Sequence, residues 1–300
     1  MENLPSLFIS GFGLAIIAAV MFVVRDMIDK HLTRHKKLSV FVVLIGQFFF
    51  IMIFILLFAF LKNELTIDAR TIFFSLIGSI FLSTGTFFQL KAITIEDFSL
   101  TLPFMSFTFI FLIPIEYLFF HQLPTMIALL GLAMIFIGTF WLSFVEAENK
   151  KRIWNLSQGA KLMIFVAFLY SAAGVIDKAG SLSSTPLGYL VWSYCFIFIT
   201  YLFIFNFFKK KKDYQEKLFL NFKKYWPWLL IIGLISCFAS WLLLTAYLKI
   251  MVNYAIAIKR AALLIPIVLG PLFFKEKHLL RRIPGALLML GGAVVIILFG

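Results

Sequence analysis

The chain has 300 residues, of which 62% are hydrophobic and 18% aromatic, and its mean hydropathy is +1.02. Only 14% of the residues are charged, against about 25% in an average soluble domain, so the composition excludes a water-soluble domain and indicates a membrane protein. The formal net charge of +13 does not indicate a nucleic-acid partner, because the basic residues lie between apolar runs, where membrane proteins keep their cytoplasmic Lys and Arg.

Long apolar runs dominate the chain, and about 20 apolar residues are enough for a helix to cross a bilayer. Because a backbone in lipid must satisfy its own hydrogen bonds, the runs predict transmembrane helices and an all-α integral membrane fold. Proline residues inside the fourth and ninth spans predict kinks in both. We expect ten spans, near residues 7–28, 38–61, 71–92, 98–120, 124–145, 159–180, 186–208, 227–248, 253–274 and 283–299.

The chain also contains an internal repeat. Residues 87–142 are similar to residues 243–298, and a shift of 154 brings glycines of the fifth and tenth spans into register. At the front of each half, Asp29-Lys30 aligns with Asp177-Lys178 at a shift of 148. We therefore predict two repeats of five helices each, in residues 1–148 and 149–300.

Lys and Arg are distributed unevenly over the connections between the predicted spans. The odd-numbered connections and their flanks hold 21 of these residues and the even-numbered ones hold 4, while Lys259 and Arg260 lie inside the ninth span. The positive-inside rule then places the odd connections in the cytoplasm and both termini outside. Since five is an odd number of spans, the second repeat must be inverted relative to the first.

Lys259 and Arg260 are the strongest candidates for a substrate site. Lys259 lies six residues past Asn253, about 9 Å of helix rise into the membrane. A charge at a helix centre costs roughly 2.5–3.5 kcal/mol to insert, so two adjacent cations predict an anion site, in which Arg binds a carboxylate or phosphate bidentately and Lys adds a point charge. Snorkelling of both side chains to the interface is the alternative. The first repeat has Met105-Ser106 at this position.

Other polar and aromatic side chains lie in the spans and could line a cavity that holds the organic part of a substrate. Interfacial aromatic belts are the alternative explanation for the aromatic members of this set. Gln89 should face the helix bundle, because a side-chain amide is costly in lipid. The candidates are Gln89, Tyr170, Trp192, Tyr247 and Tyr254.

The repeated acid–base pairs could act as gates, with one pair at each mouth of the transport path. They are Asp29 with Lys30 and Asp177 with Lys178. Anchoring of helix ends at the membrane interface is the alternative for both pairs. Glu116 is a further acid in an apolar run, and we expect it at the interface near His121.

Sequence motifs for nucleotide hydrolysis, zinc catalysis or a nucleophilic serine are absent, so we expect no enzyme activity, no cofactor and no metal site. Cys195 and Cys237 lie in apolar runs, where packing is the simplest explanation. Gly131, Gly138 and their equivalents in the second repeat predict close packing of the fifth and tenth spans.

The ten-span repeat resembles the drug/metabolite transporter (DMT) superfamily, specifically its EamA-type members. The sequence Phe273-Phe-Lys-Glu-Lys followed by Pro284-Gly285 is similar to the short helix-end signature of that family, although His121-Gln122 stands where the first copy usually has Gly-Glu. Lys259-Arg260 is similar to the pair with which plastid triose-phosphate translocators hold phosphate. The resemblance implies a central cavity, alternating access and a bacterial inner membrane. Many family members have cytoplasmic termini, the reverse of what the charges here indicate.

We therefore expect a secondary transporter of a small anionic metabolite, phosphorylated or carboxylated, that works by alternating access. An exporter of amino acids or amphipathic drug-like compounds is the alternative on the same fold. No sequence feature supports a membrane enzyme or a non-transporting subunit. The expected partners are a small-molecule substrate and the lipid bilayer, with a homodimer left open.

Overall fold

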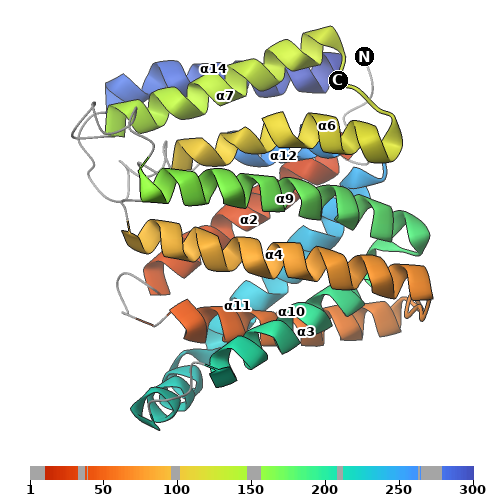
Figure 1. The fold of residues 1–300 in the computed structure, drawn as a ribbon, viewed down its shortest axis with the longest axis vertical. Helices are drawn as coiled ribbons and strands as arrows, with labels where there is room; N and C mark the ends of the chain where they lie inside the picture. The colour runs from red at the N-terminus through yellow and green to blue at the C-terminus, as the bar shows by residue number, and fades with distance from the viewer. Residues whose placement is uncertain are drawn as a thin grey trace. The chain divides into compact units, whose positions relative to one another are not determined.

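The computed structural model describes residues 11–32, 38, 40–95, 102–146, 157–207, 212–262, 264 and 279–300. Every regular element within these ranges is a helix (Figure 1). The helices are α2 (Gly11–Lys30), α3 (Val40–Leu61), α4 (Ala69–Ile95), the 3₁₀ helix η2 (Leu102–Phe107), α6 (Thr108–Phe120), α7 (Met126–Glu146), α9 (Gln158–Ser183), α10 (Pro186–Phe207), α11 (Lys212–Tyr247), α12 (Val252–Ala261) and α14 (Leu279–Phe299).

Six of the described helices are long and apolar enough to cross a membrane, and they belong to α2, α3, α4, α9, α10 and α11. Three shorter apolar helices cover Phe104–Phe120, Met126–Trp141 and Ile283–Phe299. Each of the nine coincides with a predicted span, which confirms a helical protein with multiple apolar spans. The total of ten spans stays a prediction, because most of the ninth span beyond α12 lies outside the described residues.

Two helix boundaries differ from the prediction. The eighth predicted span begins at residue 227, whereas α11 begins at Lys212 and carries Pro227 inside it. Lys, Glu and Gln before Pro227 are good helix formers, so the helix extends beyond its apolar part. The first predicted span ends at residue 28, whereas α2 continues to Lys30. The Phe273–Lys277 signature and the Lys30 side chain lie outside what the structure describes.

The chain folds into two compact units, and each unit contains parts of both predicted repeats. Unit 1 consists of residues 1–16, 84–175 and 246–300, and unit 2 consists of residues 17–83 and 176–245. Helices α6, α7, α12 and α14 belong to unit 1, and α3 and α10 belong to unit 2. The spatial division therefore differs from the division of the sequence at residue 148.

Within unit 1, α7 and α14 lie side by side and run antiparallel (Figure 1). A methyl group on Gly131 would lie 2.8 Å from the carbonyl oxygen of Gly292, and one on Gly138 would lie 2.7 Å from the carbonyl oxygen of Gly285. Glycine is thus required where the two backbones approach each other. These contacts confirm the predicted close packing of the fifth and tenth spans.

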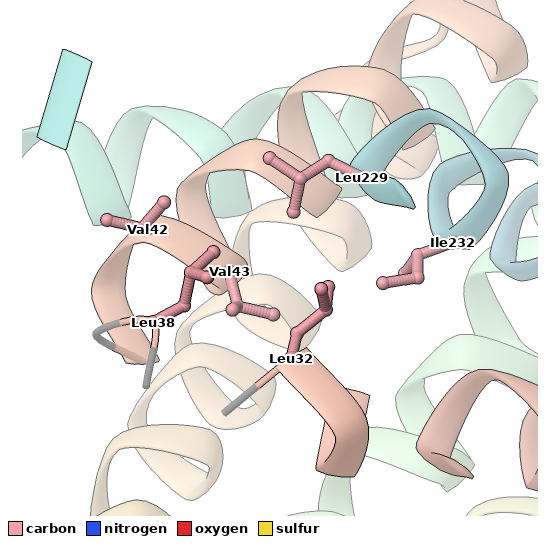
Figure 2. Packing of buried hydrophobic residues seen from close by; sticks show 6 residues of the cluster. All are labelled: Leu32, Leu38, Val42, Val43, Leu229 and Ile232. Carbon is pink, nitrogen blue, oxygen red and sulfur yellow. The ribbon is translucent and has the colours of Figure 1, made fainter. Parts of the chain in front are cut away.

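Within unit 2, an apolar cluster joins the end of α2 and the start of α3 to α11. Figure 2 shows its six side chains, which converge from these three segments. Helices α3 and α10 also pack together, and the ring of Phe48 stacks on that of Tyr201 with centroids 5.2 Å apart. The members of the cluster are Leu32, Leu38, Val42, Val43, Leu229 and Ile232.

Candidate functional site

Lys259 and Arg260 lie on the short helix α12 of unit 1. Residues 252–258 and Ala261 of this helix are buried, whereas Lys259 and Arg260 in its last turn are half-exposed. Positive side chains at a helix C-terminus interact favourably with the macrodipole, so this position stabilises both charges locally. The half-exposed side chains are also the part of α12 that a ligand could reach.

The opposite end of α12 binds a buried carboxylate that the sequence analysis placed at the interface. Glu116, on α6, is fully buried. Its Oε1 accepts a hydrogen bond from the backbone N–H of Val252 at 2.7 Å, and its Oε2 accepts from the backbone N–H of Asn253 at 3.2 Å. The Asn253 side-chain amide also donates to Oε2, at 3.0 Å. The first two N–H groups of α12, which have no partner inside the helix, are satisfied in this way.

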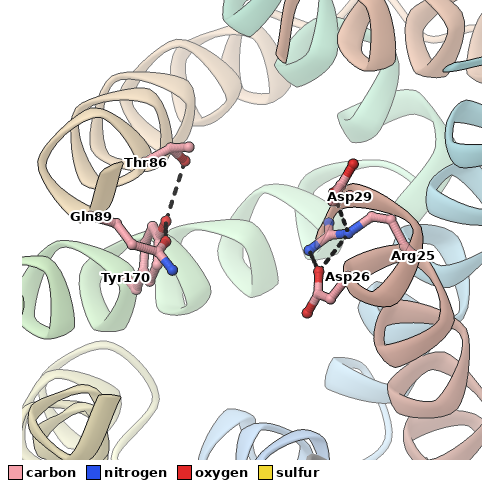
Figure 3. A network of polar contacts seen from close by, with 6 residues as sticks. All are labelled: Arg25, Asp26, Asp29, Thr86, Gln89 and Tyr170. Atoms are coloured by element: carbon pink, nitrogen blue, oxygen red, sulfur yellow. Dashed lines mark hydrogen bonds and ion pairs between the residues drawn. The ribbon is translucent and has the colours of Figure 1, made fainter. Parts of the chain in front are cut away.

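Gln89 and Tyr170, two of the predicted cavity residues, are brought together in unit 1 (Figure 3). The hydroxyl of Tyr170 on α9 donates to Gln89 Oε1 on α4 at 2.5 Å. Thr86, one helical turn before Gln89, places its hydroxyl 3.3 Å from the same Tyr170 oxygen. All three side chains are half-buried and neutral, so they form a polar group that could hydrogen-bond a ligand without charge.

Tyr247 and Tyr254 also belong to unit 1, but both are buried, with 3% and 4% of their surface exposed. The Tyr254 ring stacks on Phe12, and its hydroxyl accepts a hydrogen bond from the backbone N–H of Thr125 at 3.3 Å. Thr125 directly precedes α7 and donates its own hydroxyl to the carbonyl of Phe299 at the end of α14. Tyr254 therefore packs where helix termini meet.

Asp177 of unit 2 has a specific partner on the next helix. The hydroxyl of Tyr189 on α10 donates to Asp177 Oδ1 at 2.7 Å. Gly78 on α4 leaves room for this pair, because a methyl group there would collide with the Tyr189 hydroxyl. Lys178 beside Asp177 is buried. Trp192, also in unit 2, donates its indole N–H to the carbonyl of Thr66 at 2.9 Å, which attaches α10 to the segment between α3 and α4.

Asp29 has a different partner from its repeat equivalent Asp177. Arg25, one turn earlier on α2, lies with its Nε 3.8 Å from Asp29 Oδ2 and 2.9 Å from Asp26 Oδ1 (Figure 3). Arg25 and Asp29 are half-buried, and Asp26 is exposed. The pairing of Arg25 with Asp29 was not among the predictions, although a four-residue spacing on a helix is the sequence signal for such a pair.

The predicted site residues thus fall into two sets. Unit 1 contains Lys259, Arg260, Gln89, Tyr170 and Tyr254, together with Tyr247. Unit 2 contains Trp192, Asp29, Asp177 and Lys178. Among the described residues, no group of three or more His, Cys, Asp or Glu side chains could hold a metal ion.

Comparisons with known proteins bear on the whole chain. The model of the EamA-like transporter family matches residues 9–144 and again residues 157–298. A solved crystal structure with 12% sequence identity superimposes with a TM-score of 0.69, over 98% of this chain and 96% of its own length, and at that identity the likeness shows a shared fold alone. A search of curated protein sequences found no significant match.

Proposed function

The chain belongs to the EamA-like transporter family, a multi-pass membrane transporter family of the DMT superfamily, and from this premise we propose that it moves a small anionic metabolite across the membrane. The family match in two blocks supports a transporter assembled from a repeat. We further propose ten spans in two inverted repeats, both termini outside, and a bacterial inner membrane as the location. These points rest on the hydropathy, the charge distribution and the family resemblance.

One observation carries the choice of an anion. Helix α12 is buried along its length, yet it ends in two adjacent cations whose side chains are half-exposed. Two charges in an apolar helix are costly, and intramembrane ionisable residues commonly mark substrate paths. A guanidinium binds carboxylate or phosphate through two parallel hydrogen bonds, and an ammonium supplies a compact second charge.

The charge balance at this end of α12 favours an anionic ligand. The C-terminus of a helix carries about −0.5 of an elementary charge, which by itself would repel an anion. Lys259 and Arg260 together contribute two positive charges, so the local sum stays clearly positive. In alternating access, the clamp would be presented to each side of the membrane in turn by rocking of one repeat against the other.

Substitution of the cations tests this function. In proteoliposomes, Lys259→Gln and Arg260→Gln should each reduce uptake of phosphorylated or carboxylated probes at least tenfold, because each removes a charged hydrogen-bond donor worth about 1.5–3 kcal/mol. Lys249→Gln is the matched control, because Lys249 is an exposed cation in the turn before α12. Transport that survives both substitutions would refute the anion clamp.

An exporter of amino acids or amphipathic compounds is the second candidate. The neutral group formed by Thr86, Gln89 and Tyr170 favours it, since three half-buried hydrogen-bonding side chains in one unit suit an uncharged or zwitterionic ligand. A thermal-shift screen in detergent separates the two functions. Stabilisation by aromatic or cationic compounds, with no response to inorganic phosphate, phosphate esters or dicarboxylates, would favour the exporter.

A further inference from the structure

The contact between Glu116 and the start of α12 joins a buried charge to a helix end within unit 1. A fully buried carboxylate accepts two backbone N–H groups and one side-chain amide, and all three come from Val252 and Asn253. We propose that Glu116 is a positioning residue that sets the depth and rotation of α12, and thereby the placement of Lys259 and Arg260. This inference rests on the proposed function only in the role that it assigns to the two cations.

The helical register connects the two ends of α12. Lys259 follows Val252 by seven residues, and Arg260 follows Asn253 by seven, which places each cation about 10 Å along the axis from one of the residues that Glu116 holds. Seven residues are nearly two full turns, so Lys259 lies on the same face of α12 as Val252, and Arg260 on the same face as Asn253. A rotation or a slip of the bound end is therefore transmitted to the cations with little change.

Hydrogen bonds to the carboxylate resist both movements. The two backbone bonds diverge from separate oxygens of one side chain, and the Asn253 amide adds a third direction. Charged hydrogen bonds are about twice as strong as neutral ones, and an anion at a helix N-terminus also complements the macrodipole. Glu116 lies on α6, which packs against α12. The start of α12 is therefore held in place relative to α6.

The comparison of the two repeats links the Glu116 contact to the presence of the cations. At the shift of 154, Gly270 corresponds to Glu116 and has no carboxylate to offer. At the same shift Met105 and Ser106 correspond to Lys259 and Arg260, and both are buried in η2. The segment of the first repeat that lacks the cations thus also lacks an acid in the second repeat, at position 270, that could hold it.

Labelling of single cysteines tests the positioning without any knowledge of the substrate. Cys195 and Cys237 are replaced by Ala, and Arg260→Cys provides a reporter for a thiol-reactive maleimide on the full chain in detergent. Added to this background, Glu116→Gln should raise the labelling rate about tenfold, the effect expected from losing one charged hydrogen bond. A Gln side chain keeps the size of Glu but has a single acceptor oxygen.

Three controls make the result specific. Lys62→Cys, an exposed reporter between α3 and α4, should label at the same rate whether or not Glu116→Gln is also present. Glu116→Asp should restore most of the slow labelling, because the charge and both acceptor oxygens remain. If the contact only stabilised the fold, Glu116→Gln would lower the unfolding temperature and leave the labelling rate of the folded protein unchanged. That outcome would overturn the proposal.

A second variant covers the case in which Glu116→Gln does not fold. Asn253→Ala removes only the side-chain bond to Oε2 and should raise labelling at residue 260 by a smaller factor. Unchanged labelling in Asn253→Ala would then overturn the proposal. Failure of the anion function is seen separately: transport that tolerates Lys259→Gln and Arg260→Gln rejects the clamp, while the labelling result still decides whether Glu116 positions α12.

Discussion

Helices α7 and α14 meet through a reciprocal contact, whereas α6 and α12 meet through a one-sided one. In the first pair, Gly131 lies against Gly292 and Gly138 against Gly285, and the shift of 154 equates Gly131 with Gly285 and Gly138 with Gly292. The same two repeat positions thus form the contact on α7 and on α14, as in a two-fold symmetric interface. In the second pair, Glu116 holds α12 and its sequence equivalent is a glycine.

In unit 2, too, residues that are equivalent in the two repeats have different polar partners. Asp29 and Asp177 are equivalent at the shift of 148, but Asp177 binds a tyrosine hydroxyl and Asp29 lies near Arg25. At that shift Phe41 corresponds to Tyr189 and Ala173 to Arg25. Packing that builds the scaffold is therefore kept in both copies, whereas the polar contacts that could serve a substrate or its gates differ between them.

Copying the cations into the first repeat should have the largest effect on stability. Met105 is 4% exposed in η2, so Met105→Lys would bury an uncompensated charge and cost about 3 kcal/mol. Met105→Leu is the control and should cost less than about 1.5 kcal/mol, since it conserves volume. Thermal unfolding in detergent measures both. Equal stability of the two variants would show that the first repeat also tolerates a charge at this position.

Breaking the reciprocal contact should have the next largest effect. A methyl group on Gly292 would lie 2.5 Å from the carbonyl oxygen of Gly131, which is backbone and cannot move aside, so Gly292→Ala should cost about 2 kcal/mol. The adjacent Gly291→Ala is the matched control, because its methyl group would meet only the flexible end of Met134. Comparable unfolding temperatures for the two variants would contradict the close approach of α7 and α14.

Removal of single hydroxyl groups should have the smallest effects and sharpen the distinction between packing and function. Tyr189→Phe loses the bond to Asp177 and should cost about 1–2 kcal/mol, because a half-buried carboxylate loses a hydrogen-bond donor. Tyr254→Phe loses only a long bond to Thr125 and should cost less, about 0.5–1 kcal/mol. Transport by the folded Tyr254→Phe protein should be normal if the residue serves packing, and a loss of transport would assign its hydroxyl to the substrate.

Hydropathy along the chain was enough to predict the described apolar helices to within a few residues at most boundaries. The signal is local, because a helix in lipid satisfies its backbone within one segment and needs only an apolar sequence of sufficient length. Charged and amphipathic segments are weaker guides, which is why the predicted start of the eighth span at residue 227 differs from the start of α11 at Lys212. The repeat and its glycines predicted that the fifth and tenth spans pack closely.

The amino-acid sequence by itself determined the family, the helical membrane fold and the exceptional position of Lys259 and Arg260. Only the tertiary structure showed what holds the helix that carries them, because Glu116 and Val252 are 136 residues apart and nothing in either local pattern indicates the other. The same holds for Tyr170 with Gln89, which are 81 residues apart. Burial in lipid is a property of one segment, whereas a hydrogen bond needs a donor and an acceptor that only the packing of distant helices brings together.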